Sequence, residues 1–151
     1  MEMSGEYSID APIAEVWAAL NDIEILKVCI PGCEELEQVS ETEMTAKVAL
    51  KIGPVKARFN GVVTFENITP PEGYSIVGEG QGGVAGFAKG GADVRLVEDG
   101  DKTVLTYQAK AQVGGKIAQL GSRLIKSTAA KLADKFFKNF RDALVAEVAS
   151  A

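Results

Sequence analysis

The sequence of 151 residues contains no histidine, only two cysteines and a single tryptophan. Without histidine it cannot form a Ser-His-Asp or Cys-His nucleophile, a histidine-ligated zinc site or an imidazole acid–base catalyst. It has no run of 18 apolar residues, which excludes a membrane-spanning helix. Its first residues are neither basic nor continuously apolar, so we expect no signal peptide.

The two cysteines, Cys29 and Cys33, are too few for a zinc site, and their spacing differs from the redox motif C-x-x-C. We expect two buried, reduced thiols in a reducing cytoplasm. The carboxylates of Glu66, Glu79 and Asp93 fall on outward positions of expected strands, where they are solvated charges rather than catalysts. The residues therefore indicate neither a catalytic constellation nor a metal site.

Acidic residues outnumber basic ones by 21 to 16, and the net charge of -5 argues against a nucleic-acid partner. Residues 115–151 nevertheless carry seven basic and only three acidic side chains. A basic amphipathic helix suits a membrane surface or a partner protein, but lysines can also simply solvate the outer side of a core helix. Both interpretations stay open for the candidate face formed by Lys126, Lys131, Lys135 and Lys138.

Hydrophobic periodicity predicts a strand, two short helices, about six further strands and a long helix. Residues 3–10 alternate in character as in a strand, and Asp10 is the expected N-cap of a helix over residues 13–20. Asp22 is the expected N-cap of the second short helix, which Pro31 ends.

The middle and the end of the chain differ in period. Strand-like alternation covers residues 44–52, 57–65, 74–77, 93–96 and 105–110, and the turns between them predict an antiparallel sheet. From Gly115 onward apolar residues recur every three or four positions, and no proline or glycine follows Gly121, so we expect one long helix. The order predicts an α+β fold of one domain, residues 1–151, in which a curved sheet wraps round the final helix.

Seven of the 16 glycines lie between residues 78 and 91, and residues 78–83 formally match the dinucleotide motif G-x-G-x-x-G. A dinucleotide site needs that turn to lead into a helix, whereas the residues that follow are poor helix formers. We interpret the glycines as points where strands bend, which is compatible with a mobile apolar loop over residues 82–91 at the mouth of a cavity.

Inward-facing apolar side chains predict either a filled core or a core with a cavity. Gly61, Gly78, Gly80 and Ala109 are small where bulk would be needed to fill the space between sheet and helix. Tyr107 supplies one of the few polar atoms that such a space would use to orient a ligand. The pattern alone does not choose between the two.

Residues 11–22, which follow the first strand, resemble the START-like helix-grip superfamily, also called SRPBCC. Residues 26–33, which contain Cys-Ile-Pro-Gly-Cys, resemble the CoxG family, named for the G subunit of carbon monoxide dehydrogenase, as do residues 86–88, 114–118 and 132–137. The resemblance covers nearly the whole chain. It implies a seven-stranded antiparallel sheet round the C-terminal helix, with a hydrophobic cavity between them.

The resemblance also implies an accessory role beside an aerobic molybdenum-containing hydroxylase of the carbon monoxide dehydrogenase type. Family members are associated with attaching that enzyme to the membrane and with binding respiratory quinone for it. Many carry a C-terminal extension that reaches the bilayer, whereas this sequence ends at Ser150 and Ala151, as expected of a truncated chain or of a short member.

From this resemblance we expect a non-catalytic cytoplasmic protein, acting at the inner face of the cell membrane, whose cavity binds menaquinone or ubiquinone. The head group is expected near Cys29, Ile30 and Tyr107, whose hydroxyl can donate a hydrogen bond to a carbonyl. Two alternatives remain: an aromatase/cyclase-type enzyme of the same superfamily, and a lipid-binding docking module without a redox role. The expected cavity residues are Leu26, Cys29, Ile30, Phe59, Phe65, Phe87, Tyr107, Ile117, Leu120 and Leu124.

Overall fold

The computed structural model describes residues 1–150, and their side chains as far as Val145. Within these residues, one sheet of seven strands accompanies three α-helices and two short 3-10 helices. The strands are β1 (Glu2–Ile9), β2 (Cys33–Gln38), β3 (Glu43–Ile52), β4 (Val55–Thr69), β5 (Gly73–Gln81), β6 (Phe87–Asp99) and β7 (Lys102–Gly114). The helices are α1 (Ile13–Leu20), α2 (Ile23–Cys29) and α3 (Ser122–Ser150), and the 3-10 helices are η1 (Gly83–Ala85) and η2 (Lys116–Leu120).

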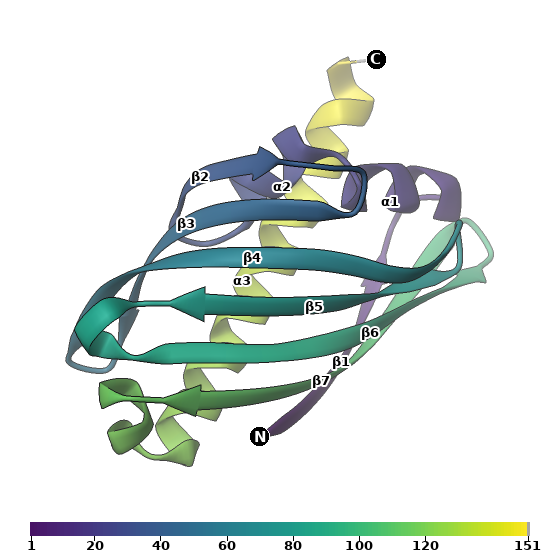
Figure 1. Cartoon of the computed structure of the whole chain (residues 1–151). Coiled ribbons are helices and arrows are strands. Elements are labelled where there is room, and N and C mark those ends of the chain that lie inside the picture. The colour runs from purple at the N-terminus through teal and green to yellow at the C-terminus, as the bar shows by residue number, and fades with distance from the viewer. Residues whose placement is uncertain (151) are drawn as a thin grey trace.

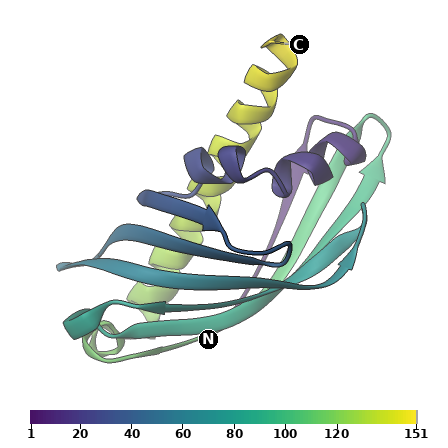
Figure 2. The ribbon, with the colours of Figure 1, turned by 45° about the horizontal axis from the view of Figure 1, so that its top comes forward.

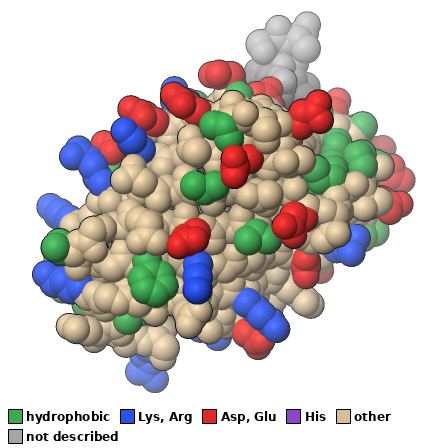
Figure 3. All heavy atoms as spheres, viewed as in Figure 1, with side chains coloured by type: hydrophobic (Ala, Val, Ile, Leu, Met, Phe, Trp, Pro, Cys, Tyr) green, Lys and Arg blue, Asp and Glu red, His purple; other side chains and the backbone are tan. Residues whose placement is uncertain are grey.

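The sheet has the strand order β1-β7-β6-β5-β4-β3-β2, and every neighbouring pair is antiparallel. The turns expected at Gly53–Pro54 and Asp99–Gly100 are present. The sheet curves strongly round α3, which crosses its concave side (Figures 1 and 2). Figure 3 shows the convex side, where charged side chains of both signs stand among uncharged groups. The expected α+β helix-grip architecture is confirmed.

The two short helices form where the apolar spacing predicts them. The expected cap of α2 is confirmed, because the Asp22 carboxylate accepts hydrogen bonds from the backbone N–H groups of Glu24 and Ile25. The expected cap of α1 is wrong. Pro12 occupies the N-cap position of α1 without a side-chain bond, because Asp10 lies two residues too early to reach the free N–H groups.

The long helix begins later than its apolar period predicts, at Ser122 rather than near Gly115. Residues 116–120 form η2 instead, and Gly121 follows with a φ of +92°. Because a side chain is strained at that φ, the glycine allows the chain to change direction before α3 begins. From there α3 runs along the concave side of the sheet to Ser150 (Figure 1).

The glycine-rich segment is mostly strand, which corrects the expected mobile loop. Only residues 82–86 connect β5 to β6, and residues 87–91 pair with strands on both sides. A Cβ atom on Gly90 would collide with the carbonyl oxygen of Lys110, so the absence of side chains lets β6 and β7 approach closely here. The glycines thus extend the sheet instead of interrupting it.

Candidate functional site

The candidate site lies between the concave face of the sheet and α3, where the hydrophobic core is interrupted. The core is divided into three clusters of buried side chains. The largest surrounds Leu105 and Phe140, the second joins Leu26 to β2 and β3, and the third surrounds Phe59 and Ile117 beneath η1 and η2. The middle of the concave face, between these clusters, remains partly exposed.

Small residues occupy this middle region. They share the face of Phe59 and Val94, because side chains alternate along a strand. Across the described residues, the backbone of α3 packs mainly against α2, η2, β1 and β3 and less against the central strands. The small residues therefore do not serve a close approach of the helix; they leave space beneath it. These small residues form three pairs on neighbouring strands, and all six are partly exposed: Gly61 with Gly80, Gly78 with Gly90, and Ala92 with Ala109.

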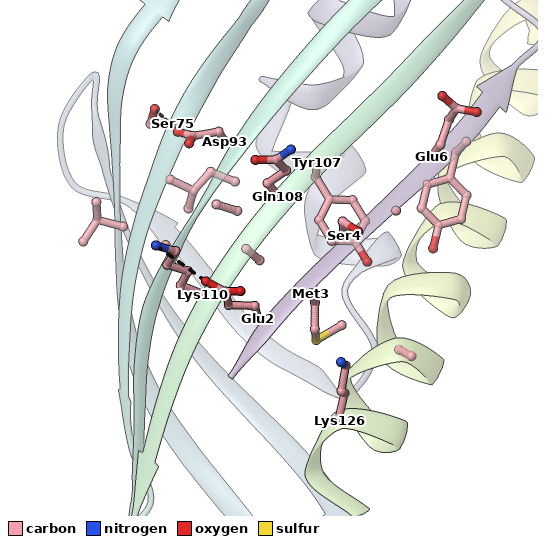
Figure 4. Close-up of a pocket in the computed structure, with 18 of the residues that line it drawn as sticks. Glu2, Met3, Ser4, Glu6, Ser75, Asp93, Tyr107, Gln108, Lys110 and Lys126 are labelled. Atoms are coloured by element: carbon pink, nitrogen blue, oxygen red, sulfur yellow. Dashed lines mark hydrogen bonds and ion pairs between the residues drawn. The ribbon is translucent and has the colours of Figure 1, made fainter. Parts of the chain in front are cut away.

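A pocket of about 1260 Å³ opens along β1 and β7. Its lining includes both faces of the sheet, so only part of this volume lies between sheet and helix. The outer part runs past Asp93 and Gln108, whereas the inner part is bounded by Met3, Tyr107 and Lys126. In Figure 4, Lys126 reaches from α3 toward Met3 on β1. Ligand pockets for drug-sized molecules commonly span about 300–1000 Å³, and the whole pocket, counted over both faces, exceeds this range.

Tyr7 connects β1 to α3 at one end of the gap between sheet and helix, which is the inner part of the pocket. Its hydroxyl donates a hydrogen bond to Asp134 Oδ1 at 2.6 Å, and its ring stacks on Phe137 with centroids 4.1 Å apart. The Arg141 guanidinium lies 5.6 Å from the centroid of the Tyr7 ring. Burial, followed by the bond to Asp134, raises the pKa of Tyr7. Tyr7 therefore stays neutral and holds the edge strand against the helix.

Tyr107 lies on the neighbouring strand, directly opposite Gly5. Its ring covers Gly5 so closely that a Cβ atom there would come within 2.5 Å of Tyr107 Cε1. Burial raises the pKa of Tyr107, so its hydroxyl remains protonated at neutral pH and able to donate a hydrogen bond. Gly5 thus provides the room that places this donor beside the gap.

The expected cavity residues do not form one wall. Leu26 and Ile30 belong to the second cluster, and Phe65 packs against both the first and the second. The third cluster brings together Phe59, Ile117 and Leu120. The ring of Phe87 lies against Gly114, and Leu124 lies beside the Gly53 turn. Of the ten expected cavity residues, one, Tyr107, lines this pocket.

Cys29 is 0% exposed within the largest core cluster, and its carbonyl accepts a hydrogen bond from Asn139 Nδ2 at 3.1 Å. Burial raises the pKa of its thiol to about 11. A fully covered, protonated thiol presents no surface to a ligand. In this structure Cys29 is therefore a core residue, and the pocket beside Tyr107 is lined by other side chains.

Sequence reasoning missed the contribution of β1 and of one side of α3. The pocket is lined by Met3, Gly5 and Tyr7 from β1, and by Ala130 and Asp134 from α3. A signal exists in the sequence, because Lys126, Ala130 and Asp134 are spaced by four residues and so share one face of a helix. These residues lie on another side of the helix from the apolar stripe, so a search by hydrophobic period does not find them.

The expected lysine face is divided between two sides of α3. Lys131, Lys135 and Lys138 lie within about 60° of one another at 100° per residue, and all are exposed. Lys126 is at least about 120° away from each of them and lines the pocket. Lys138 forms an ion pair with Asp142 at 3.0 Å, which is a pairing between solvent-exposed neighbours.

Comparisons with known proteins identify the family and the fold of the chain. A family model for CoxG, described as the G subunit of carbon monoxide dehydrogenase, matches residues 5–145. The crystal structure of a conserved protein from Geobacillus kaustophilus is similar, with a TM-score of 0.91 and 32% sequence identity over 96% of this chain and 95% of that one. A search of the curated proteins found no match.

Two more distant structures share the fold. A START superfamily protein from Mycobacterium smegmatis superposes with a TM-score of 0.72 at 14% identity, over 95% of this chain and 96% of that one. The Zhui aromatase/cyclase from Streptomyces sp. R1128 does so with a TM-score of 0.68 at 11% identity, over 98% of this chain and 95% of that one. At these identities they establish the fold alone. With its START-like helix-grip fold and a family match from β1 to the last turns of α3, the chain belongs to the CoxG family of carbon monoxide dehydrogenase.

Proposed function

We propose that the chain is a non-catalytic accessory protein that binds a respiratory quinone, menaquinone or ubiquinone, for a molybdenum-containing hydroxylase of the carbon monoxide dehydrogenase type. The family and the START-like fold support a hydrophobic-ligand-binding accessory protein. The observation that carries the proposal is the divided core, which leaves the small residues of the concave face uncovered beneath α3.

The inner part of the pocket suits a molecule with a compact polar head and an apolar remainder. Tyr107 offers a protonated hydroxyl to a quinone carbonyl, whereas the Tyr7 hydroxyl is already engaged by Asp134. The apolar part would lie along Ile76, Ala92 and Ala109, which line the same pocket from three adjacent strands. This proposal places the head group beside β1 and α3 rather than beside the buried Cys29.

An enzymatic role has less support than ligand binding. The polar pair at the gap, Tyr7 and Asp134, is committed to a mutual hydrogen bond and to holding β1 against α3. The likeness to an aromatase/cyclase is a likeness of fold alone, at 11% identity. The family description, which names a dehydrogenase subunit, favours an accessory role.

The proposed place of action is the inner face of the cell membrane, beside the hydroxylase and the quinone pool. In the part of the chain that the structure describes, no helix combines the length and the apolarity needed to cross a bilayer. Affinity purification of the tagged chain from its host should recover molybdenum hydroxylase subunits.

Quinone uptake tests the proposal directly. Delipidated protein is incubated with menaquinone-4 or decylubiquinone and examined by native mass spectrometry, and we expect one quinone per chain. Ala109→Trp fills the inner pocket and should abolish the complex, whereas Ala14→Trp, on the exposed side of α1, should leave it intact. A wild-type chain that takes up neither quinone, or equal uptake by both variants, would contradict the proposal.

A further inference from the structure

Charge is segregated between the two ends of the sheet. One end contains the β3–β4 turn, η1, η2 and the start of α3, which meet over the third core cluster. The segments that build this end, residues 48–57, 80–91 and 111–125, contain five basic residues and no aspartate or glutamate. In Figure 3 basic side chains stand along the left edge, where these elements lie, and acidic ones along the right edge. The acidic end holds the other turns, with Glu41, Glu72, Glu98, Asp99 and Asp101.

The basic side chains at this end form no ion pair within the described residues. All five basic side chains are exposed, and the ion pairs found in this part of the chain use Lys47, Arg58, Lys110 and Lys138 instead. Glu79 lies across from one of the five, Lys89, and offsets part of this charge; its carboxylate also accepts a hydrogen bond from Gln81. The five are Lys51, Lys56, Lys89, Lys116 and Arg123.

An apolar side chain projects from the middle of this basic surface. Val84, in η1, is 93% exposed, whereas Ala85 beside it is 3% exposed and anchors η1 in the third core cluster. A firmly seated turn thus presents a bare apolar side chain to solvent. Basic residues round an exposed apolar group are the combination by which peripheral proteins bind the interface of anionic membranes.

We infer that this end, the basic tip (Lys51, Lys56, Val84, Lys89, Lys116 and Arg123), docks on an anionic lipid bilayer with Val84 among the lipid headgroups. The inference rests on the proposed function, because the bilayer is where a respiratory quinone resides. The tip is a different surface from the Lys131, Lys135 and Lys138 side of α3. Since the whole chain has a net charge of -5, an anionic surface attracts the tip and repels the opposite end, which orients the molecule.

Vesicle co-sedimentation with two matched triple variants tests the charge. The protein is mixed at low salt with vesicles of phosphatidylglycerol and phosphatidylcholine, or of phosphatidylcholine alone. Each basic residue near an anionic leaflet strengthens binding about fivefold, so Lys51→Glu, Lys56→Glu and Lys116→Glu together should weaken binding to the anionic vesicles at least about a hundredfold. The same change of charge at Lys131, Lys135 and Lys138 should weaken it far less.

A pair of single substitutions tests the apolar contact. Val84→Trp should strengthen binding to the anionic vesicles several-fold, because tryptophan favours the membrane interface. Val97→Trp is the matched control, since Val97 is 60% exposed on β6 near the acidic end, and it should leave binding unchanged. Equal effects of the two tryptophans would overturn the insertion of Val84.

Quinone uptake, measured on the same proteins, separates this inference from the proposed function. Tip variants that lose vesicle binding but still take up menaquinone-4 support docking through the tip. A wild-type chain that takes up quinone yet ignores anionic vesicles overturns the docking and leaves the quinone proposal standing; an acidic protein partner would then fit the tip. Equal losses of vesicle binding in the two triple variants would also overturn docking through the tip.

Discussion

Cys29 and Cys33 are four residues apart but occupy different environments. Cys29 ends α2 inside the largest core cluster, as expected of a buried thiol. The expected burial of Cys33 is wrong, because Cys33 begins β2, is partly exposed and donates a hydrogen bond to the Glu35 carbonyl. Burial raises the pKa of both thiols, and that of Cys29 reaches about 11. Neither thiol is activated, which agrees with a structural role for this segment.

The raised pKa of Cys29 predicts a stability that falls in alkali. Between pH 9 and about pH 11 the unfolded thiol has lost its proton and the folded one has not. The unfolded state then binds fewer protons, so the free energy of unfolding decreases as pH rises, by up to about 1.4 kcal/mol per pH unit for this group. Urea denaturation at pH 8 to 11 should show a shallower decrease for Cys29→Ala than for wild type.

Cys33→Ala is the control for this measurement. Because Cys33 is partly exposed, its variant should retain most of the wild-type decrease. Tyr7 and Tyr74, whose pKa values are also raised by burial, contribute equally to all three proteins and cancel in the comparison. Identical pH profiles for wild type and Cys29→Ala would show that Cys29 ionises as readily in the folded chain as in the unfolded one.

At the scale of elements, the contact between β1 and α3 joins the two ends of the chain. β1 is an edge strand that pairs only with β7 within the sheet, so its other side depends on the helix. Tyr7 provides that connection through its bond to Asp134 and its stacking on Phe137. The gap beside this connection is the candidate ligand site, so its rigidity bears on function.

Asp134→Asn should loosen this connection. A hydrogen bond to a charged partner contributes about 1.5–3 kcal/mol when well shielded, and because Asp134 is exposed we expect a loss of about 1 kcal/mol in the free energy of unfolding. Hydrogen exchange of β1 amides should accelerate at the same time. Asp142→Asn, which removes only a surface ion pair with Lys138, should cost less than about 0.5 kcal/mol and leave β1 unchanged. Equal effects of the two substitutions would mean that the hydrogen bond from Tyr7 to Asp134 contributes nothing to stability.

The elements themselves were largely predictable because their signals are local. The periods of two and of about four residues located most of the sheet and all three α-helices, and the Asp22 cap was readable from its position. The start of α3 was not, because η2 is held by packing against η1 and the third core cluster rather than by its own sequence. The same holds for residues 87–91, whose extension into β6 depends on pairing with β5 and β7.

The site was less predictable than the fold. Large apolar side chains were expected to line the cavity, but Leu26, Cys29 and Ile117 are buried in the clusters that bound the space. The space itself is lined by residues too small or too polar to fill it, such as Gly5 and Ala130. A sequence shows which residues favour burial, whereas a cavity depends on how far apart the fold holds its layers.

For the whole molecule, the central question is whether the core is hollow, and one change in side-chain size can answer it. Ala92 lies on the concave face, partly exposed and lining the pocket, whereas Ala19 in α1 is 2% exposed in the largest core cluster. Adding methylene groups to a filled core costs about 1–3 kcal/mol, because neighbouring side chains and backbone must shift. A larger side chain that enters empty space instead buries apolar surface, which is stabilising.

Ala92→Leu should therefore leave the free energy of unfolding within about 1 kcal/mol of wild type or raise it, while Ala19→Leu lowers it by about 1–3 kcal/mol. Both are measured by urea denaturation of delipidated protein, so that a bound ligand does not mask the difference. Ala92→Leu should also reduce quinone uptake, since it occupies the volume proposed for the ligand. If the two leucines are equally destabilising, the concave face is already packed, and the chain can act only through its surface.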